Sequence, residues 1–331
     1  MKNKPNLAIV GATGLVGLTI LKVLEEENLE FENIFLFASK KSRGKLLKFQ
    51  GKNLEVEVLN EKSFNREIDV ALFVSNKDVS KVFIPLALRK GIKVIDNSSF
   101  YRNDPNIPLI VSGVNDNLIT KDDYIISNPN CSTIQSILAL HKINEKYKIK
   151  RIVYSTYQAV SGSGYNGVLD LLNTEEGKPN KFYSDPIANN LIPSIGDIGL
   201  DGYSLEELKM INETKRIFMD PNLEVTATCV RVPVVNSHSI SINIECEKKI
   251  DLKELISELK LLEYLSIYEN DYPTPRLVSG SNLVHIGRLR VDKSVENGMN
   301  LWVVADNLRV GAATNAVRIL KKLLKGDSYD L

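Results

Sequence analysis

The chain has few cysteines and few histidines for its length, with three of each in 331 residues. Cys131, Cys229 and Cys246 cannot all pair, and no two of them have the CxxC spacing of a redox or zinc motif. We therefore expect no disulfide framework, no metal site and a reducing, cytoplasmic location. The small number of histidines also shortens the search for a general base.

An excess of one charge sign and long apolar runs are also lacking. The formal net charge is +1, so there is no electrostatic case for nucleic acid or an anionic membrane as a partner. The apolar runs are too short to span a bilayer, and the N-terminus does not have the pattern of a signal peptide. The apolar content of 43% and the length indicate a globular protein of two domains or one large one.

The first half alternates between strand and helix patterns. Residues 6–10 form an apolar run that predicts a buried strand, and a glycine turn and an amphipathic helix to about Glu26 follow it. Further strands are predicted at 33–38, 70–74, 93–96 and 124–126. This alternation predicts a doubly wound parallel sheet of the Rossmann type.

The second half has a different pattern, which predicts an α+β domain with a mixed sheet. A polar stretch at 161–202 predicts loops with short helices, and Ser204 with Glu207 forms a capping box that opens a helix to about Met219. Long strands are predicted at 150–160, 225–232, 239–246, 283–290 and 301–305, and a last helix at 312–324. We expect one domain over 1–130, with 308–331 returning as a helix packed on it, and a second over 131–307.

The glycine turn Gly11-Ala12-Thr13-Gly14-Leu15-Val16-Gly17 follows the first strand and opens a helix. In this context bare backbone N–H groups can bind the phosphates of a dinucleotide, although glycine-rich turns are common in α/β proteins. The loop after the second strand, Ser39-Lys40-Lys41-Ser42-Arg43, has no acidic residue and three basic ones. It favours NADP over NAD, and the alternative is a solvated basic loop.

Cys131 lies in Ser127-Asn128-Pro129-Asn130-Cys131-Ser132-Thr133, between a short strand and a helix. The helix dipole and backbone N–H groups at such a position favour a thiolate, and Asn130 can form local hydrogen bonds. This suits a nucleophile that attacks an acyl carbon. The alternative is an inert small residue at a helix cap.

Several charged or titratable residues stand out by their position in the sequence. Arg231 lies inside an apolar strand, which indicates either an anion receptor or an internal salt bridge. His238 follows the end of that strand and is the best base candidate, because His141 and His285 lie within helix and strand patterns. Arg102 lies just past another strand end. Glu206 and Lys209 are three residues apart on one helix face, a spacing that also fits an ordinary surface pair.

Together these segments resemble the aspartate-β-semialdehyde dehydrogenase family. The blocks are GATGLVG, DNSSFYR, SNPNCSTIQ, STYQAVSGSG, EELKMINETKRI, CVRVPVVNSHS and VVADNLRVGAATNAVRI, in the family's order. They run from the beginning of the chain to nearly its end, and the ordered set is far more specific than any single block.

The resemblance implies reversible, NADP-dependent conversion of L-4-aspartyl phosphate to L-aspartate 4-semialdehyde and phosphate through a cysteine thioester and hydride transfer. This step feeds the biosynthesis of lysine (through diaminopimelate), threonine, methionine and isoleucine. It implies catalytic roles for Cys131 as nucleophile and His238 as acid/base. The implied substrate-binding residues are Arg102, Asn130, Gln158, Glu206, Lys209 and Arg231, with Arg102 and Lys209 at the phosphate and Asn130 at the oxyanion.

The resemblance also implies a cofactor site and an assembly. The cofactor-binding residues would be Gly11, Thr13, Gly14, Leu15, Val16, Ser39, Lys41, Ser42, Arg43, Ser161, Gly162 and Asn307. The assembly would be a homodimer or a dimer of dimers, with the sheet of the second domain at the interface. The chain departs from the family pattern around Lys41, where members often have an arginine, and in the shorter, more polar region 161–202.

Two other functions compete with this one. N-acetyl-γ-glutamyl-phosphate reductase shares the thioester chemistry, but its acylated substrate nitrogen does not call for an acid such as Glu206. That enzyme also tends to have glycine and an aromatic residue beside its cysteine, where this chain has Asn130 and Ser132. A nucleotide-sensing module that had lost catalysis would be expected to lack Cys131 or His238, and both are present.

Overall fold

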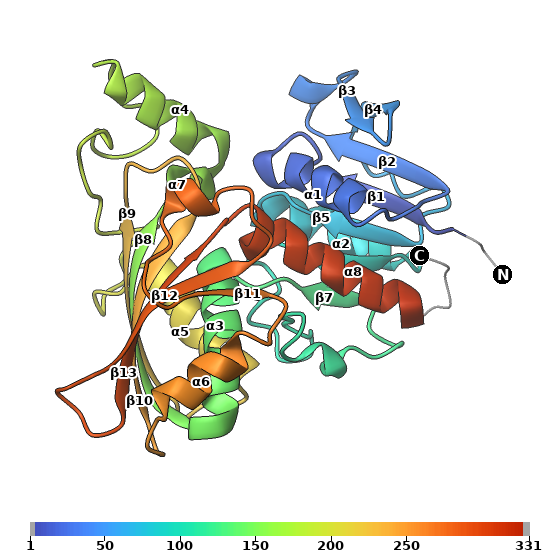
Figure 1. The fold of residues 1–331 in the computed structure, drawn as a ribbon. Coiled ribbons are helices and arrows are strands. Elements are labelled where there is room, and N and C mark those ends of the chain that lie inside the picture. Colours follow the sequence, from blue (N-terminus) through green and yellow to red (C-terminus); the bar gives the residue numbers. More distant parts are fainter. Residues whose placement is uncertain (1–3, 327–331) are drawn as a thin grey trace. The chain divides into compact units, whose positions relative to one another are not determined.

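The computed structural model describes residues 4–326, and they form two compact units. The N-terminal unit comprises the chain up to Pro129 together with the segment from Ala312 onward, and the C-terminal unit comprises Asn130–Gly311 (Figure 1). Among the helices of the described residues, none is both long and apolar enough to cross a membrane. Each unit has its own sheet and is described separately.

The N-terminal unit is built on a seven-stranded sheet of order β3-β4-β2-β1-β5-β6-β7. Its neighbouring strands are parallel, except for β3 and β4, which pair as an antiparallel edge. The strands are β1 (Asn6–Val10), β2 (Asn33–Ala38), β3 (Leu46–Phe49), β4 (Lys52–Val58), β5 (Val70–Phe73), β6 (Lys93–Asp96) and β7 (Ile125–Ser127). Strand β1 is buried along its whole length, as its continuous apolar run predicts.

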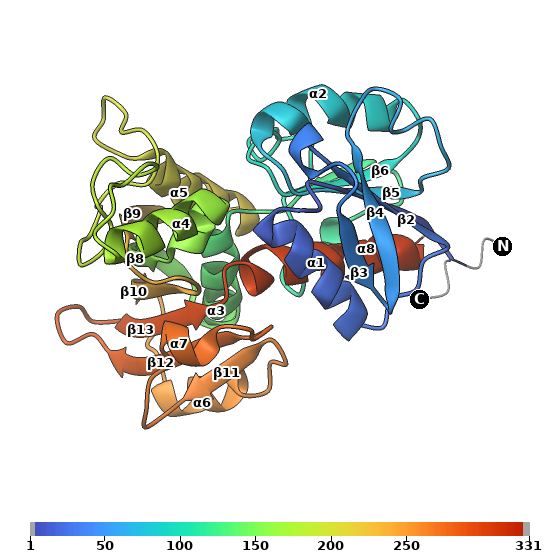
Figure 2. The same ribbon diagram turned by 90° about the horizontal axis from the view of Figure 1, so that it is seen from above.

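Helices cover both faces of this sheet. Figure 2 shows α1 (Leu15–Glu26) and α8 (Asn315–Gly326) on one side and α2 (Lys77–Leu88) on the other. Two apolar cores correspond to these layers. One joins Ile20 and Leu24 of α1 with Val317 and Leu320 of α8 against the sheet, and the other places α2 on the opposite face. Short 3-10 turns follow β2 and precede β7, at Lys40–Ser42 and Asp116–Leu118.

The C-terminal unit is built on a six-stranded mixed sheet of order β11-β12-β13-β10-β8-β9. The pairs β8·β9 and β11·β12 are parallel and the other pairs are antiparallel. The strands are β8 (Ile149–Gln158), β9 (Glu224–Arg231), β10 (His238–Cys246), β11 (Leu265–Tyr268), β12 (Val284–Val291) and β13 (Gly298–Ala305).

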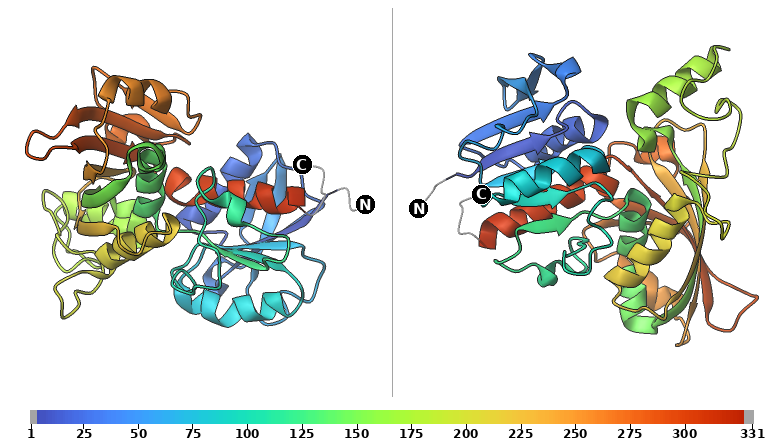
Figure 3. Two further views of the ribbon diagram at one scale, coloured as in Figure 1. Left: turned by 90° about the horizontal axis from the view of Figure 1, so that it is seen from below. Right: turned by 180° about the vertical axis from the view of Figure 1, so that it is seen from behind.

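The helices of this unit pack mainly on one face of its sheet (Figure 3). On that face lie α3 (Cys131–Tyr147), α5 (Leu205–Ile217) and α6 (Leu252–Leu259). The other elements are a 3-10 turn (Val160–Ser163), α4 (Gly164–Glu175), α7 (Pro275–Val278) and a π-helical turn (Arg309–Thr314) that precedes α8. The opposite face of the sheet carries the partly exposed side chains of Tyr157 and Trp302.

The predicted fold class is confirmed, because a parallel-rich N-terminal sheet is joined to a mixed C-terminal sheet with helices. The capping box is also confirmed, since the Ser204 hydroxyl accepts from the Glu207 N–H and the Ser204 N–H donates to the Glu207 carboxylate. Sequence patterns did not predict β3, β4, α6 or β11. Helix α4, at 12 residues, is longer than the short helices predicted there.

Candidate active site

The glycine turn after β1 leaves an open helix N-terminus. Gly11 has φ +95°, and a Cβ there would lie 2.7 Å from the Val74 carbonyl oxygen, so only glycine fits. Gly14 is the N-cap of α1 and provides no side-chain cap, which leaves the first N–H groups of the helix open to a ligand. A cavity of about 470 Å³ lies over this turn. The turn therefore fits the phosphates of a dinucleotide.

The predicted cofactor residues of this unit have different environments. Gly11, Thr13, Gly14 and Ser39 line the cavity, and Leu15 and Val16 are the first two residues of α1. Ser42 is buried and its hydroxyl bonds that of Thr13 at 3.0 Å.

The loop after β2 carries basic side chains near the cavity over the glycine turn. Lys41 is exposed, whereas Arg43 and Lys40 line a neighbouring cavity of about 600 Å³. Lys40 also lines the cavity over the glycine turn, a role that sequence reasoning missed. The loop therefore presents lysine and arginine side chains to a phosphate group of a bound nucleotide. The Ser42 hydroxyl, in contrast, already bonds the Thr13 hydroxyl.

Arg102 lies in the loop after β6, in the N-terminal unit. Its side chain is buried, and Nη2 donates to the Asn97 carbonyl oxygen at 2.6 Å. The buried carboxylate of Asp96, at the end of β6, accepts from the Ser80 hydroxyl and from both the N–H and the hydroxyl of Ser98. These contacts fix the loop that carries Arg102.

Cys131 is the first residue of α3, four residues after β7 ends, so its predicted place between a strand and a helix is confirmed. Asn130 is the N-cap, and its Oδ1 accepts from the N–H groups of Ser132 (2.9 Å) and Thr133 (3.2 Å).

None of the three cysteines forms a disulfide. Burial raises the pKa of Cys229 and of Cys246 to about 12. Those two thiols are therefore poor nucleophiles, in contrast to the partly exposed Cys131.

Helix α5 holds Asn130 from two sides. The Asn130 N–H donates to Glu213 Oε2 at 2.6 Å, and Asn130 Nδ2 donates to Glu206 Oε1 at 2.8 Å. Lys209 Nζ lies 3.0 Å from the other Glu206 oxygen, so the predicted pair forms. Burial opposes ionisation of Glu206, but Lys209, Asn130 and Arg231 outweigh it and lower its pKa. A buried carboxylate therefore stays charged beside the residue that precedes Cys131.

The backbone of one residue, Ala159, organises the buried residues at the carboxyl end of β8. The Ala159 N–H donates to His238 Nδ1 at 3.0 Å, and the Ala159 carbonyl accepts from Arg231 Nη1 at 2.6 Å. Because Nδ1 accepts this bond, a neutral His238 carries its proton on Nε2. Burial first, and then the nearby Arg231, lower the pKa of His238 to about 3. Gln158 pairs with Arg231 in the register of β8 and β9.

Small residues bring the next turn close to this group. A Cβ at Gly162 would lie 3.0 Å from Arg231 Nη1 and 3.2 Å from His238 Nε2. Ser161 and Asn307, both predicted as cofactor residues, bond each other, with Asn307 Nδ2 donating to Ser161 Oγ at 3.0 Å. Asn307 Oδ1 also accepts from the Ser237 N–H at 2.9 Å.

Several buried polar atoms without a hydrogen-bond partner belong to α3 and to the residues around Ala159. Within residues 4–326 they include His238 Nε2, Arg231 Nε and Gln135 Oε1, together with the hydroxyls of Ser132, Thr133 and Ser136 in the first turns of α3. Buried polar groups normally find partners, so this concentration indicates a site for a polar ligand or ordered water. The described residues contain no cluster of three or more histidine, cysteine, aspartate or glutamate side chains that could hold a metal ion.

The predicted site residues thus fall into two sets. The C-terminal unit brings together Asn130 and Cys131 with Glu206 and Lys209, and it joins Gln158, Arg231 and His238 around Ala159. Arg102 and the glycine turn belong to the N-terminal unit. Sequence reasoning missed Glu213 and the backbone N–H and carbonyl of Ala159. Glu213 carried a signal, because it lies seven residues, or about two turns, after Glu206 on one helix.

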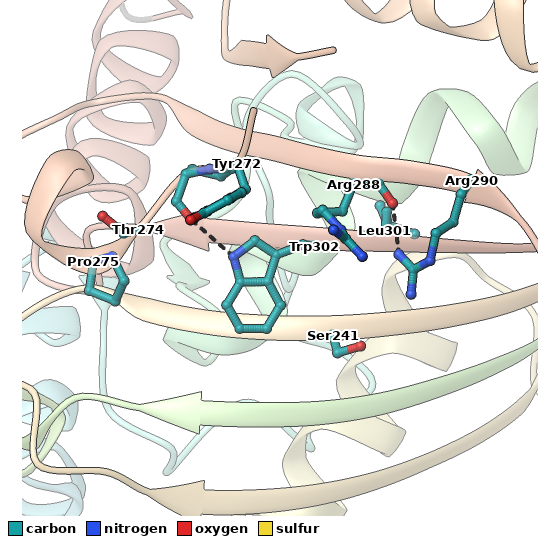
Figure 4. A pocket seen from close by; sticks show the side chains of 9 residues that line it. Ser241, Tyr272, Thr274, Pro275, Arg288, Arg290, Leu301 and Trp302 are labelled. Carbon is teal, nitrogen blue, oxygen red and sulfur yellow. Dashed lines mark hydrogen bonds between the residues drawn. The ribbon is translucent and has the colours of Figure 1, made fainter. Parts of the chain in front are cut away.

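A second hollow, of about 390 Å³, lies in the C-terminal unit. Figure 4 shows Trp302 on β13 beside Arg288 and Arg290 of the adjacent strand, with Tyr272, Thr274 and Pro275 at one end. The Trp302 indole N–H donates to the Pro273 carbonyl at 3.0 Å, and its ring lies 5.7 Å from that of Tyr157. None of the predicted catalytic or substrate-binding residues lines this hollow.

Comparison with known proteins agrees with this architecture. Residues 6–122 match the family model "Semialdehyde dehydrogenase, NAD binding domain", and residues 140–310 match "Semialdehyde dehydrogenase, dimerisation domain". These matches place the chain among the semialdehyde dehydrogenases, a class of oxidoreductases.

Full-length relatives narrow the class. The chain is 46% identical to an aspartate-semialdehyde dehydrogenase of Aquifex aeolicus (96% of this chain, 98% of the relative) and 42% identical to that of Bacillus subtilis (97% of each). A crystal structure of aspartate semialdehyde dehydrogenase II from Vibrio cholerae superimposes with a TM-score of 0.92 at 40% identity, covering 97% of this chain and 99% of that one. The chain belongs to the aspartate-semialdehyde dehydrogenase family.

Proposed function

We propose that the protein reduces L-4-aspartyl phosphate to L-aspartate 4-semialdehyde and phosphate, reversibly and with NADPH, in the pathway to lysine, threonine, methionine and isoleucine. One observation carries the proposal. Asn130, the residue before Cys131, bonds the buried Glu206, which pairs with the half-buried Lys209, and the same unit buries a second cation, Arg231. A substrate with an ammonium, a carboxylate and a phosphate requires this set of charges. The Vibrio cholerae relative was also solved in complex with ASA.

The proposed reaction begins at Cys131. Its thiolate forms a bond to the acyl carbon, the bond from that carbon to the phosphate oxygen breaks, and phosphate leaves with a proton that the general acid, assigned to His238, supplies. A thioester remains on Cys131. When bound, the nicotinamide supplies the hydride that reduces this thioester. The carbon–sulfur bond of the resulting hemithioacetal then breaks, which releases the aldehyde and restores the thiolate. Sulfur suits this chemistry because an oxygen ester is a much poorer hydride acceptor.

The remaining residues bind and orient the substrate. We assign the substrate carboxylate to Arg231 and Gln158, its ammonium group to Glu206, and its phosphate to Arg102 and Lys209. Asn130 uses Oδ1 and one Nδ2 hydrogen within the protein, so the second Nδ2 hydrogen is what it can offer to an oxyanion. We assign the acid/base role to His238. Its neutral form presents an Nε2–H donor, so Nε2 can accept a proton only in the other tautomer, which requires the Nδ1 contact to the Ala159 N–H to break.

We further propose NADP as the cofactor. The Gly11–Gly14 turn would hold its pyrophosphate, and the basic loop with Lys40, Lys41 and Arg43 its 2′-phosphate. Ser161, Gly162 and Asn307 would contribute from the C-terminal unit. Residues 1–130 with 308–331 would form the NADP-binding domain and residues 131–307 the catalytic and dimerisation domain. The absence of disulfides supports a cytoplasmic location.

We propose a homodimer, or a dimer of dimers, that uses the C-terminal sheet. Residues 140–310 match a dimerisation domain, and Tyr157 and Trp302 expose aromatic surface on the face opposite α3, α5 and α6. Large exposed apolar side chains on α4, Tyr165 and Leu169, extend the apolar surface of this unit. Light scattering of the purified protein measures the assembly directly.

The test of function is a reductase assay with purified protein. NADPH oxidation is expected with aspartyl phosphate and not with N-acetyl-γ-glutamyl phosphate. Cys131→Ser is expected to fold normally and lose activity by several orders of magnitude, and iodoacetamide is expected to label Cys131 in a reaction that substrate slows. Turnover of the acetylated analogue alone would identify the alternative reductase. NADP binding without turnover of either substrate would identify a sensing module.

A further inference from the structure

The segment Asp306–Gly311 follows β13 and makes an unusual turn. The Gly311 N–H donates to the Asp306 carbonyl at 3.2 Å, a bond that spans five residues, and residues 309–314 are π-helical. We call residues 306–311, which this bond closes and which overlap the start of the π-helical segment 309–314, the π-turn. Turns of this kind are rare and are found frequently at functional sites.

One end of the π-turn is anchored next to His238. Asp306 Oδ2 accepts from Asn236 Nδ2 at 2.7 Å, and Asn307 Oδ1 accepts from the Ser237 N–H at 2.9 Å. Asp306 Oδ1 also accepts from the next two backbone N–H groups, those of residues 308 and 309. The start of the turn is therefore fixed both internally and to the two residues that precede His238.

The other end of the π-turn lies against the nucleophile. A Cβ on Gly311 would lie 2.7 Å from Cys131 Cβ, 3.1 Å from its Cα and 3.3 Å from its carbonyl oxygen. Gly311 does not have a positive φ, so its backbone conformation does not require glycine. Close contact with Cys131 is what excludes a side chain at this position.

We propose that the π-turn sets the spacing between the Cys131 thiol and His238, with Gly311 as a positioning residue and Asp306 as its anchor. The inference rests on the proposed function, in which Cys131 is the nucleophile. Carbon atoms in good contact lie about 3.5–4.0 Å apart, so a methyl group at Gly311 must shift one of the two segments by about 1 Å. A displacement of about 1 Å at a reacting centre can lower the rate about 10²-fold.

The experiment compares Gly311→Ala with a control of equal crowding. A Cβ at Gly287 on β12 would lie 2.7 Å from Pro273 Cδ, and Gly287 also lacks a positive φ, but the atoms it would meet belong to residues 271–273. Gly311→Ala is expected to lower kcat about 10²-fold, while the KM values for aspartyl phosphate and for NADPH stay close to those of the wild type. It is also expected to change the rate at which iodoacetamide alkylates Cys131. Gly287→Ala is expected to shift only the melting temperature.

Variants of Asp306 test the other end without adding volume. Asp306→Ala is expected to lower kcat, and Asp306→Asn, which keeps one acceptor oxygen, is expected to recover part of the loss. These variants decide the question if Gly311→Ala does not fold. The proposal is overturned if both glycine variants lose kcat in step with melting temperature, or if the two Asp306 variants are equally active. An inactive wild type, or an active Cys131→Ser, overturns the proposed function instead, while the alkylation rates still report the geometry.

Discussion

His238 should make the stability of the protein depend on pH, and His238→Asn should remove that dependence. The imidazole is fully buried beside Arg231, and its pKa is lowered from 6.5 to about 3. The unfolded chain therefore binds a proton between these two values where the folded chain does not. The stabilisation is fully present above pH 6.5 and is lost as pH falls below it, at a limiting rate of about 1.4 kcal/mol per pH unit.

The window from pH 6.5 to 4.5 isolates this effect from the buried carboxylate. The pKa of Glu206 is lowered from 4.5, so its own contribution begins to be lost only towards the lower end of this window and is lost mainly at lower pH. Over these two pH units His238 should cost wild type about 2.3 kcal/mol of unfolding free energy, because the limiting slope is reached only about one unit below pH 6.5. Asn at this position keeps an oxygen near the Ala159 N–H and does not titrate, so the variant should lack this loss.

Urea unfolding at a series of pH values measures the difference. His141→Asn is the control, because His141 lies on the surface of α3 with Glu145 as its ion-pair partner, and its imidazole is only partly buried. That variant should keep most of the acid sensitivity. If wild type and His238→Asn lose stability equally between pH 6.5 and 4.5, His238 is protonated in the folded protein, and our account of its environment is wrong.

Two other substitutions test the binding assignments. Arg231→Leu should weaken substrate binding, and a melting curve decides between roles, since unchanged stability supports a carboxylate receptor and a collapse supports an internal structural contact to Ala159. Charge-assisted pairs lose about 2–5 kcal/mol when one partner is truncated. Replacing Lys41 and Arg43 together with alanine should raise the KM for NADP far more than that for NAD, whereas equal effects on both would mean that the loop does not recognise the 2′-phosphate.

Local patterns in the sequence predicted the parts of the structure that local interactions determine. The apolar run before Gly11 predicted β1, and the Ser204–Glu207 spacing predicted the start of α5. The change from strand to helix around Cys131 was also visible, because a cap residue followed by a helical apolar pattern needs no tertiary information. The hairpin β3–β4 was missed because its side chains are mostly exposed and its apolar alternation is weak.

The geometry of the site depends on contacts between distant segments, which no local pattern reports. The proton of neutral His238 lies on Nε2 because a backbone N–H 79 residues away in sequence donates to Nδ1. An unperturbed histidine titrates near pH 6.5, whereas burial and the nearby Arg231 lower the pKa of His238 to about 3, an effect that no local pattern reports.

The glycines make the same point about close approach. Neither Gly162 nor Gly311 has a positive φ, so turn chemistry does not explain them. A Cβ at Gly311 would overlap Cys131, and a Cβ at Gly162 would be in tight contact with Arg231 and His238. Sequence patterns reveal a glycine that needs positive φ, because the turn around it has recognisable neighbours. A glycine required only for space becomes apparent once the partner segment is placed. Gly162 and Gly311 are two glycines of this kind that lie against the residues to which we assign the chemistry.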